Sequence, residues 1–136
     1  MITAVDTNVL LDLFGADPVF GPRSQQALRS SLAEGRLIAC EVVWTEVASF
    51  FPSPKAAREA MGRLGVEFSP VAVETALAAG QVWKVHRSRG GKRARVVADF
   101  LIGAHAQLQA ERLLTRDRGF YRTYFSRLRL LDPVRS

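Results

Sequence analysis

Residues 1–14 of the chain read MITAVDTNVLLDLF, and this stretch indicates the class of fold. Residues 2–5 form a short apolar run, which favours a buried β-strand. The run ends at Asp6, and residues 7–14 have the pattern of a helix that follows at once. Asp6 could cap that helix by accepting hydrogen bonds from its first backbone N–H groups. It could also be the first ligand of a metal site.

Short apolar runs alternate with helical patterns along the rest of the chain. We expect further strands at residues 37–39, 66–68, 113–115 and 128–131. We expect further helices at residues 23–34, 41–51, 54–64, 71–86, 97–112 and 119–125. In the helix at 71–86, Val73, Leu77 and Val82 are the candidates for the core. This alternation predicts the α/β class, with a mainly parallel sheet covered by helices on both faces.

The composition is that of an ordinary globular protein, with 48% hydrophobic and 24% charged residues among 136. This length predicts a single domain over residues 1–136. The single cysteine, Cys40, cannot form an internal disulfide, and the first twenty residues hold no Lys or Arg, unlike a secretory signal. No apolar run approaches the roughly 20 residues that cross a bilayer. We therefore expect a cytoplasmic protein that does not contact a membrane.

The positive charge is concentrated in the second part of the chain. Residues 84–136 hold thirteen Lys or Arg and four Asp or Glu, whereas residues 1–83 hold six and nine. A basic half favours binding to a polyanion, most commonly nucleic acid. The simpler alternative is that these charges only keep the protein soluble.

Four carboxylates occur in surroundings that are unusual for solvated acids. Asp6 and Asp117 directly follow expected strands, while Glu46 and Asp99 lie within the apolar segments EVVWTEVASFF and VVADFLIGAHA. Each has a simpler explanation when taken alone: a helix cap for Asp6 or Asp99, a helix edge for Glu46, and a surface salt bridge for Asp117. By contrast, Asp12 and Asp17 have the pattern of surface positions.

Taken together, the four acids favour a metal site. They come from four separate elements, and the carboxyl ends of parallel strands form the edge at which such folds bind ligands. Unpaired buried carboxylates are costly, and a divalent cation would offset their charge. Oxygen ligands without a Cys or His cluster are typical of Mg²⁺ or Mn²⁺. The two histidines, His86 and His105, lie on separate expected helices.

At these residues the sequence resembles the PIN-domain ribonucleases, in particular the VapC toxins of toxin–antitoxin pairs. The similar segments are AVDTNVLLDLF, the helix with Trp44 to Val47, VVADFLIGAHA, and LLTRDRGFYRTYF with LRLLDP, from residue 4 to residue 133. The resemblance implies a three-layer α/β/α PIN-like fold. It also implies that Asp6, Glu46, Asp99 and Asp117 form the catalytic Mg²⁺ or Mn²⁺ site, with Asn8 and Thr115 in support.

The resemblance further implies a function and partners. The function is that of a metal-dependent endoribonuclease toxin, which hydrolyses RNA phosphodiester bonds with a Mg²⁺-activated water. The implied partners are a cognate antitoxin, which covers the acidic site, and a second copy in a homodimer. Operator DNA would be bound only through the antitoxin.

Basic residues near the expected site are candidates for contact with RNA, because charge on the backbone dominates affinity for nucleic acids. The segment RSRGGKRAR at residues 87–95 could grip phosphates, or it could be a solvated loop. Packing is favoured over base stacking for Tyr121 and Tyr124. The RNA-binding candidates are Arg87, Arg89, Lys92, Arg93, Arg95, Arg116 and Arg118.

Two alternatives to the toxin remain open. One is a PIN nuclease that processes RNA without an antitoxin. The other is a non-enzymatic module of the receiver type, which would need a Lys near a late strand. The chain has three Lys residues, at positions 55, 84 and 92, and this counts against a receiver.

Overall fold

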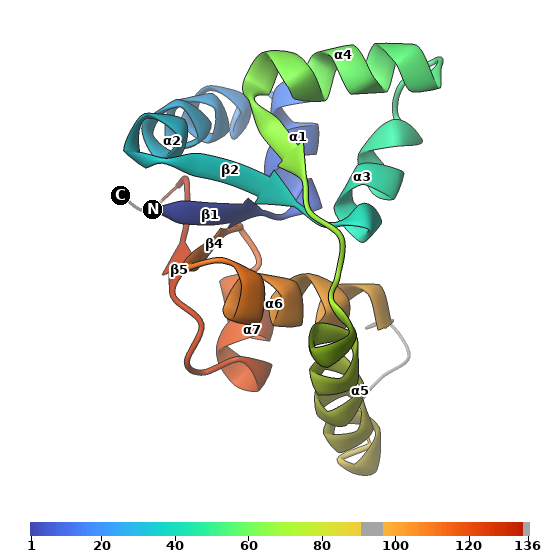
Figure 1. Ribbon diagram of the computed structural model, residues 1–136. Coiled ribbons are helices and arrows are strands. Elements are labelled where there is room, and N and C mark those ends of the chain that lie inside the picture. Colours follow the sequence, from blue (N-terminus) through green and yellow to red (C-terminus); the bar gives the residue numbers. More distant parts are fainter. Residues whose placement is uncertain (91–96, 135–136) are drawn as a thin grey trace.

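The computed structural model describes residues 1–90 and 97–134. Strands and helices alternate along the chain, as the sequence predicts (Figure 1). The strands are β1 (Ile2–Val5), β2 (Arg36–Ala39), β3 (Val66–Phe68), β4 (Arg112–Leu114) and β5 (Leu130–Leu131). The helices are α1 (Thr7–Phe14), α2 (Gly21–Glu34), α3 (Glu41–Ala48), α4 (Pro54–Leu64), α5 (Val73–Ser88), α6 (Val97–Gln109) and α7 (Arg118–Tyr124).

The strands form one five-stranded parallel sheet in the order β3-β2-β1-β4-β5. The first strand is therefore the central one, and Thr3 pairs with Leu37 of β2 on one side and with Arg112 of β4 on the other. Because it has neighbours on both sides and helices over the sheet, β1 is buried, as its apolar sequence predicts.

The chain path assigns the helices to the two faces of the sheet. From β1 it moves outward to β2 and β3, and it then returns across the sheet to β4 and β5. Since such crossovers are almost always right-handed, α1 to α4 cover one face and α5 to α7 the other. Figure 1 shows α1 to α4 gathered around β2 and β3, with α6 and α7 beside β4 and β5 and with α5 against α6, away from these two strands. The direction of winding changes between β1 and β4, where such folds place their ligands.

This strand order excludes the receiver-type alternative. Receiver-like domains have the order 2-1-3-4-5, with the first strand next to the edge strand. Here β1 lies at the centre and β3 forms one edge. The three-layer α/β/α arrangement with a parallel sheet is thus confirmed.

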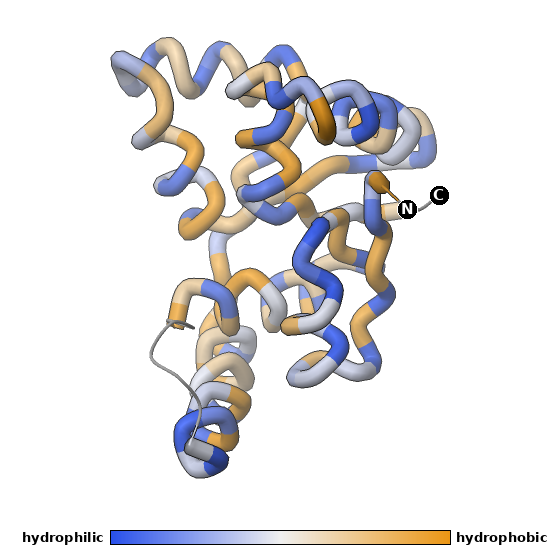
Figure 2. The backbone as a smooth tube through the Cα atoms, turned by 180° about the vertical axis from the view of Figure 1, so that it is seen from behind, coloured by the Kyte–Doolittle hydropathy of each residue, from blue (hydrophilic) through white to orange (hydrophobic). Residues whose placement is uncertain are grey.

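Local signals in the sequence define several element ends accurately. Ser53 caps α4, because its hydroxyl accepts a hydrogen bond from the N–H of Ala56, and Pro54 occupies the first helical position. The same helix ends at Gly65, which has a left-handed φ of 74° that glycine adopts without strain. Apolar segments run through the centre of the molecule, while the end of α5 near residue 90 is strongly hydrophilic (Figure 2).

Other expectations about the helices were wrong. On α5 the buried residues are Thr75, Ala79 and His86. Of the three expected core residues, Val73 and Leu77 are exposed, and Val82 is partly buried against the core. The helix expected at 97–112 ends at Gln109, because Arg112 already belongs to β4 and pairs with Thr3. The helix expected at 41–51 ends at Ala48. None of the described helices has both the length and the apolar character needed to cross a membrane.

Candidate metal site

The candidate site lies at the carboxyl ends of β1 and β4, where the winding of the sheet changes direction. Asp6 directly follows β1, and Thr115 directly follows β4. The backbone N–H of Asp6 donates to the carbonyl of Leu114 at 2.9 Å, which extends the pairing of the two strands to the site. The rigid centre of the sheet therefore positions the first candidate ligand.

The Asp6 carboxylate is 6% exposed and accepts four hydrogen bonds. Its Oδ1 accepts from the N–H of Thr7 at 2.8 Å, so Asp6 caps α1. Its Oδ2 accepts from the hydroxyl of Thr115 at 2.7 Å, the hydroxyl of Tyr121 at 3.1 Å and the amide of Asn8 at 3.2 Å. The cap and the site thus share one carboxylate, with one oxygen toward the helix and the other toward the neighbouring side chains.

The pKa values of Asp6 and Tyr121 record the electrostatics of this pocket. The pKa of Asp6 is raised from 3.8 to about 6, mainly by burial and also by the charge of Asp99, against the lowering effect of its hydrogen bonds. Burial also raises the pKa of Tyr121, and the charges of Asp6, Asp99 and Asp117 act in the same direction. Three of the four expected carboxylates therefore act on one pocket.

Asp99 and Asp117 approach this pocket from two further elements. Asp99 is the third residue of α6 and is half-buried. Asp117 occupies the N-cap position of α7, where its side chain makes no capping bond, and its backbone N–H donates to the Thr115 hydroxyl at 3.0 Å. Thr115 thus contacts both Asp6 and the backbone of Asp117, which links the ends of β1 and β4 through one hydroxyl.

Glu46 differs from the expectation, because its side chain is exposed and not enclosed by the apolar residues of α3. It lies on the solvent side of α3, one residue before the buried Val47. Its carboxylate accepts a hydrogen bond from the hydroxyl of Thr7 at 2.7 Å. Glu46 is consequently connected to the residue that follows Asp6, at the rim of the pocket.

Two contributors were not expected from the sequence. Thr7 joins Asp6 to Glu46 through its backbone and hydroxyl, and Tyr121 donates its hydroxyl to Asp6 while its ring is 1% exposed. The expected supporting residues, Asn8 and Thr115, both bond to Asp6. Packing is confirmed for Tyr121, but no feature of its local sequence indicates the polar contact.

The donor chemistry fits a hard divalent cation. Within residues 1–90 and 97–134, no three His, Cys, Asp or Glu side chains already stand close enough together to hold an ion. Mg²⁺, however, usually takes one or two carboxylates and keeps several waters, so it needs no cage built entirely of protein. A buried carboxylate with a raised pKa is a group whose ionised form a nearby cation would favour.

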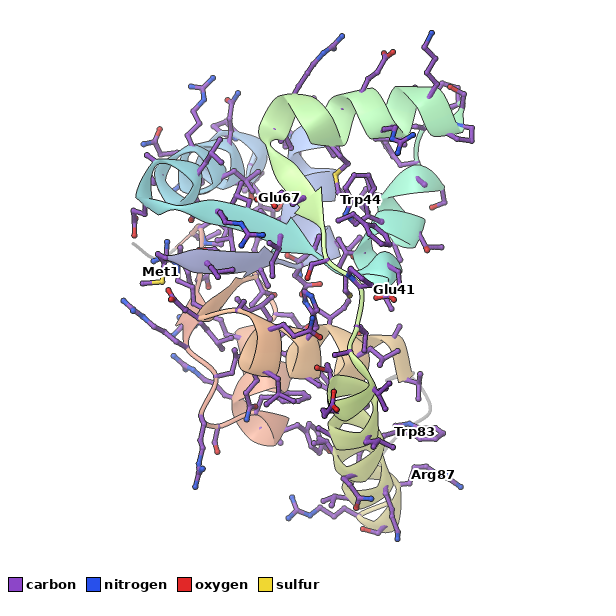
Figure 3. All side chains as sticks on the ribbon, viewed as in Figure 1. Met1, Glu41, Trp44, Glu67, Trp83 and Arg87 are labelled. Carbon is purple, nitrogen blue, oxygen red and sulfur yellow. The ribbon has the colours of Figure 1, made fainter. Side chains whose placement is uncertain are left out.

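The basic residues proposed for RNA have different surroundings. Arg87 lies over the ring of Trp83 at 4.9 Å, at the end of α5 that Figure 3 shows farthest from the sheet. Arg89 follows that helix and is exposed, and Arg118 lies 3.8 Å from Asp132. Lys92, Arg93 and Arg95 lie outside the described residues.

Arg116 and Asp12 correct two expectations about the surface. Asp12 is 5% exposed and accepts two bonds from the guanidinium of Arg116, at 2.7 and 2.9 Å. This pairing holds the pKa of Arg116 above its ordinary value. Asp12 is therefore no surface position, and the guanidinium of Arg116 is already engaged within the protein.

Comparisons with known proteins agree with the fold. The PIN domain family model matches residues 3–126. A search of curated proteins found no match.

Several solved structures are similar to this chain. VapBC-1 from nontypeable Haemophilus influenzae has a TM-score of 0.75 at 19% identity, over 99% of this chain and 100% of that one. VapBC2 from Rickettsia felis, bound to a DNA fragment from its promoter, has a TM-score of 0.74 at 17% identity, over 97% and 98%. A toxin–antitoxin complex from Klebsiella pneumoniae has a TM-score of 0.71 at 20% identity, over 96% and 97%. At such identities the likeness shows the fold alone.

Proposed function

Since the chain belongs to the PIN domain family, we propose that it is a divalent-metal-dependent endoribonuclease of the VapC type, the toxin of a toxin–antitoxin pair. One observation carries this proposal. Asp6 after β1 and Asp117 after β4 are joined by one hydroxyl, since Thr115 donates to Asp6 Oδ2 at 2.7 Å and accepts from the N–H of Asp117 at 3.0 Å, and the charges of Asp6, Asp99 and Asp117 all act on the buried Tyr121. Carboxylates collected at the switch point of a parallel sheet suit hydrolysis of a phosphodiester.

The residues have distinct roles in this proposal. Asp6, Glu46, Asp99 and Asp117 would hold Mg²⁺ or Mn²⁺, which when bound supplies an activated water and offsets negative charge on the phosphate. Asn8 and Thr115 hold Asp6 in place by donating to its Oδ2. Tyr121 donates to the same oxygen, and its buried ring excludes water from that side.

Basic residues of α5, of α7 and of the segment between α5 and α6 would hold the RNA backbone. Arg87 and Arg89 lie at the exposed end of α5, and Arg118 opens α7 directly after Asp117. Together with Lys92, Arg93 and Arg95 they would attract phosphates. We leave Arg116 out of this surface, because its guanidinium is bound to Asp12.

A protein partner is supported by the apolar surface. A groove of about 680 Å³ is lined by residues of α3, α4 and β3, among them Trp44 and Phe68. The Nε1 donor of Trp44 is buried and lacks a hydrogen-bond partner in the described part of the chain. The similar VapBC structures are toxin–antitoxin complexes, so we propose a cognate antitoxin as partner, with operator DNA bound through it. We propose further that the protein is cytoplasmic and forms a homodimer, for which the exposed Val73 and Leu77 of α5 supply apolar surface.

Cleavage of a panel of RNAs by the purified protein, with Mg²⁺ or Mn²⁺ and with EDTA, tests the proposal. We expect metal-dependent cleavage that is lost in Asp99→Asn. Glu74→Gln makes the same chemical change on the exposed first turn of α5 and should cleave as the wild type does. Cleavage that survives EDTA, or equal cleavage by Asp99→Asn, would contradict the proposal.

Expression in a bacterial host separates a toxin from an RNA-processing nuclease. A toxin should arrest growth when it is expressed alone, and a small DNA-binding protein encoded directly upstream should relieve the arrest. Growth that is unaffected by an active nuclease would favour RNA processing without an antitoxin.

A further inference from the structure

Arg116 lies between Thr115 and Asp117, and its guanidinium is held at its tip by helix α1. Its Nε donates to Asp12 Oδ2 at 2.7 Å, and its Nη2 donates to Asp12 Oδ1 at 2.9 Å. Two parallel bonds of this kind fix direction as well as distance. The pair therefore defines where the turn after β4 lies relative to α1.

Neighbouring residues of α2 and of the segment before it also fix the carboxylate of Asp12 and the guanidinium of Arg116. The hydroxyl of Ser24 on α2 donates to Asp12 Oδ2 at 3.0 Å. The guanidinium of Arg116 lies 4.0 Å above the ring of Phe20, which closes it off from solvent on that side. A partly buried ion pair is weak evidence for stability, since apolar residues of similar volume often serve as well. The ion pair between Asp12 and Arg116 is therefore better explained by the orientation that it imposes on the turn after β4 than by a gain in stability.

The backbone of Arg116 is held by the same face of α1. Asn8 and Asp12 are four residues apart on the helix, so their side chains lie on one face. Asn8 Oδ1 accepts a hydrogen bond from the N–H of Arg116 at 3.2 Å. Helix α1 thus holds Arg116 at both ends, and the next residue along the chain is Asp117.

We propose that Asp12 and Arg116 are a positioning pair, which sets the turn at residues 115–117 and thereby the place of Asp117 relative to Asp6. Neither side chain is required to contact the metal or the RNA. The inference rests on the proposed function only in assigning Asp6 and Asp117 to the metal. The positioning of the turn itself is a statement about the metal-free protein.

Two variants and one control test the pair. Asp12→Asn keeps the size of the side chain and removes its charge, and Arg116→Lys keeps the charge and removes the two-bond geometry. Val66→Ala removes two buried methyl groups from β3, an edge strand outside the site, and controls for loss of stability alone. If Asp12→Asn does not fold, Arg116→Lys still tests whether the pair positions the turn.

The first measurement is hydrogen exchange of individual backbone amides without metal. We expect the amides of Arg116 and Asp117 to exchange at least about tenfold faster in both variants, as expected for local opening, with the amides of β2 unchanged. Val66→Ala should not raise exchange at residues 116 and 117 selectively. Wild-type protection of these two amides in both variants would overturn the inference.

The second measurement is Mn²⁺ affinity, by calorimetry on the purified protein. We expect binding to weaken about tenfold, or about 1.4 kcal/mol, in both variants and not in Val66→Ala. Equal affinity in all proteins would overturn the link from the turn to the metal site. Absence of Mn²⁺ binding by the wild type would instead contradict the proposed function, while the exchange experiment would still decide whether the pair sets the turn.

Discussion

Replacing Asp6 with asparagine should make the metal-free protein progressively more stable relative to the wild type as the pH rises from 4 to 7, although Asp6 is the best-connected residue of the site. Burial raises the pKa of this carboxyl from 3.8 to about 6 in the folded protein. The folded state therefore binds more protons than the unfolded state between these values. By linkage, the contribution of Asp6 to the free energy of unfolding falls as the pH rises through this window.

The expected size of the effect follows from the pKa values. A change of one in pKa corresponds to about 1.4 kcal/mol. From pH 4 to pH 7 the charge on Asp6 should lower the free energy of unfolding by about 2–3 kcal/mol. Asp6→Asn has no charge to develop, so its stability relative to the wild type should rise by that amount over the same range. Its amide oxygen can still accept from the N–H of Thr7, which preserves the cap.

Urea denaturation in EDTA at several pH values measures this difference. Glu74→Gln, a carboxylate-to-amide change on the exposed first turn of α5, is the control. A difference between Asp6→Asn and the wild type that stays constant from pH 4 to pH 7 would refute the reasoning.

Added metal should reverse the order. With Mn²⁺ at about 100 times its dissociation constant, the wild type should gain about 2.7 kcal/mol. Asp6→Asn should gain much less. The charge of Asp6 would then destabilise the metal-free protein and stabilise the metal-bound protein.

Three further substitutions test the fold around the site. Gly103→Ala should lower the free energy of unfolding by about 1–3 kcal/mol, because the added Cβ would overlap the ring of Phe125; urea denaturation measures the loss. Ser53→Ala removes the cap of α4 and should cost about 1 kcal/mol in the same assay, without loss of RNA cleavage. Thr115→Val should cost about 1–3 kcal/mol, since the hydroxyl that bonds with Asp6, Asn8 and the N–H of Asp117 is lost, and should raise the pKa of Asp6 further, as carbon-13 NMR of the carboxyl can show.

Local chemistry explains which parts of the fold could be predicted. The apolar run at residues 2–5 matches β1 because a central parallel strand is buried on both faces. The ends of α4 follow from Ser53, Pro54 and Gly65, whose preferences act within a few residues. Features of this kind depend on a few neighbouring residues, so they can be predicted from the sequence without knowledge of the tertiary structure.

The predictions that were wrong concern the burial of side chains, which depends on residues far away in the sequence. On α5, apolar residues occur on both sides of the helix, and the side packed on α6 carries Thr75 and Ala79 while Leu77 remains outside. The burial of Asp12 depends on Arg116, which is 104 residues away. Glu46 has apolar neighbours in sequence, yet the turn of α3 directs it to solvent. For the site, the acidic residues could be proposed from their pattern, whereas the contacts of Thr7 and Tyr121 could not.

The central position of β1 also governs when the site can exist during synthesis. Asp6 is synthesised 109 residues before its hydrogen-bond partner Thr115. A nascent chain that ends before residue 112 can form only the β3-β2-β1 part of the sheet, and it exposes one edge of the central strand β1. The pocket therefore cannot form before residues 112–117 have been synthesised, and a chain that terminates earlier would lack the pocket while carrying an open strand edge that favours aggregation.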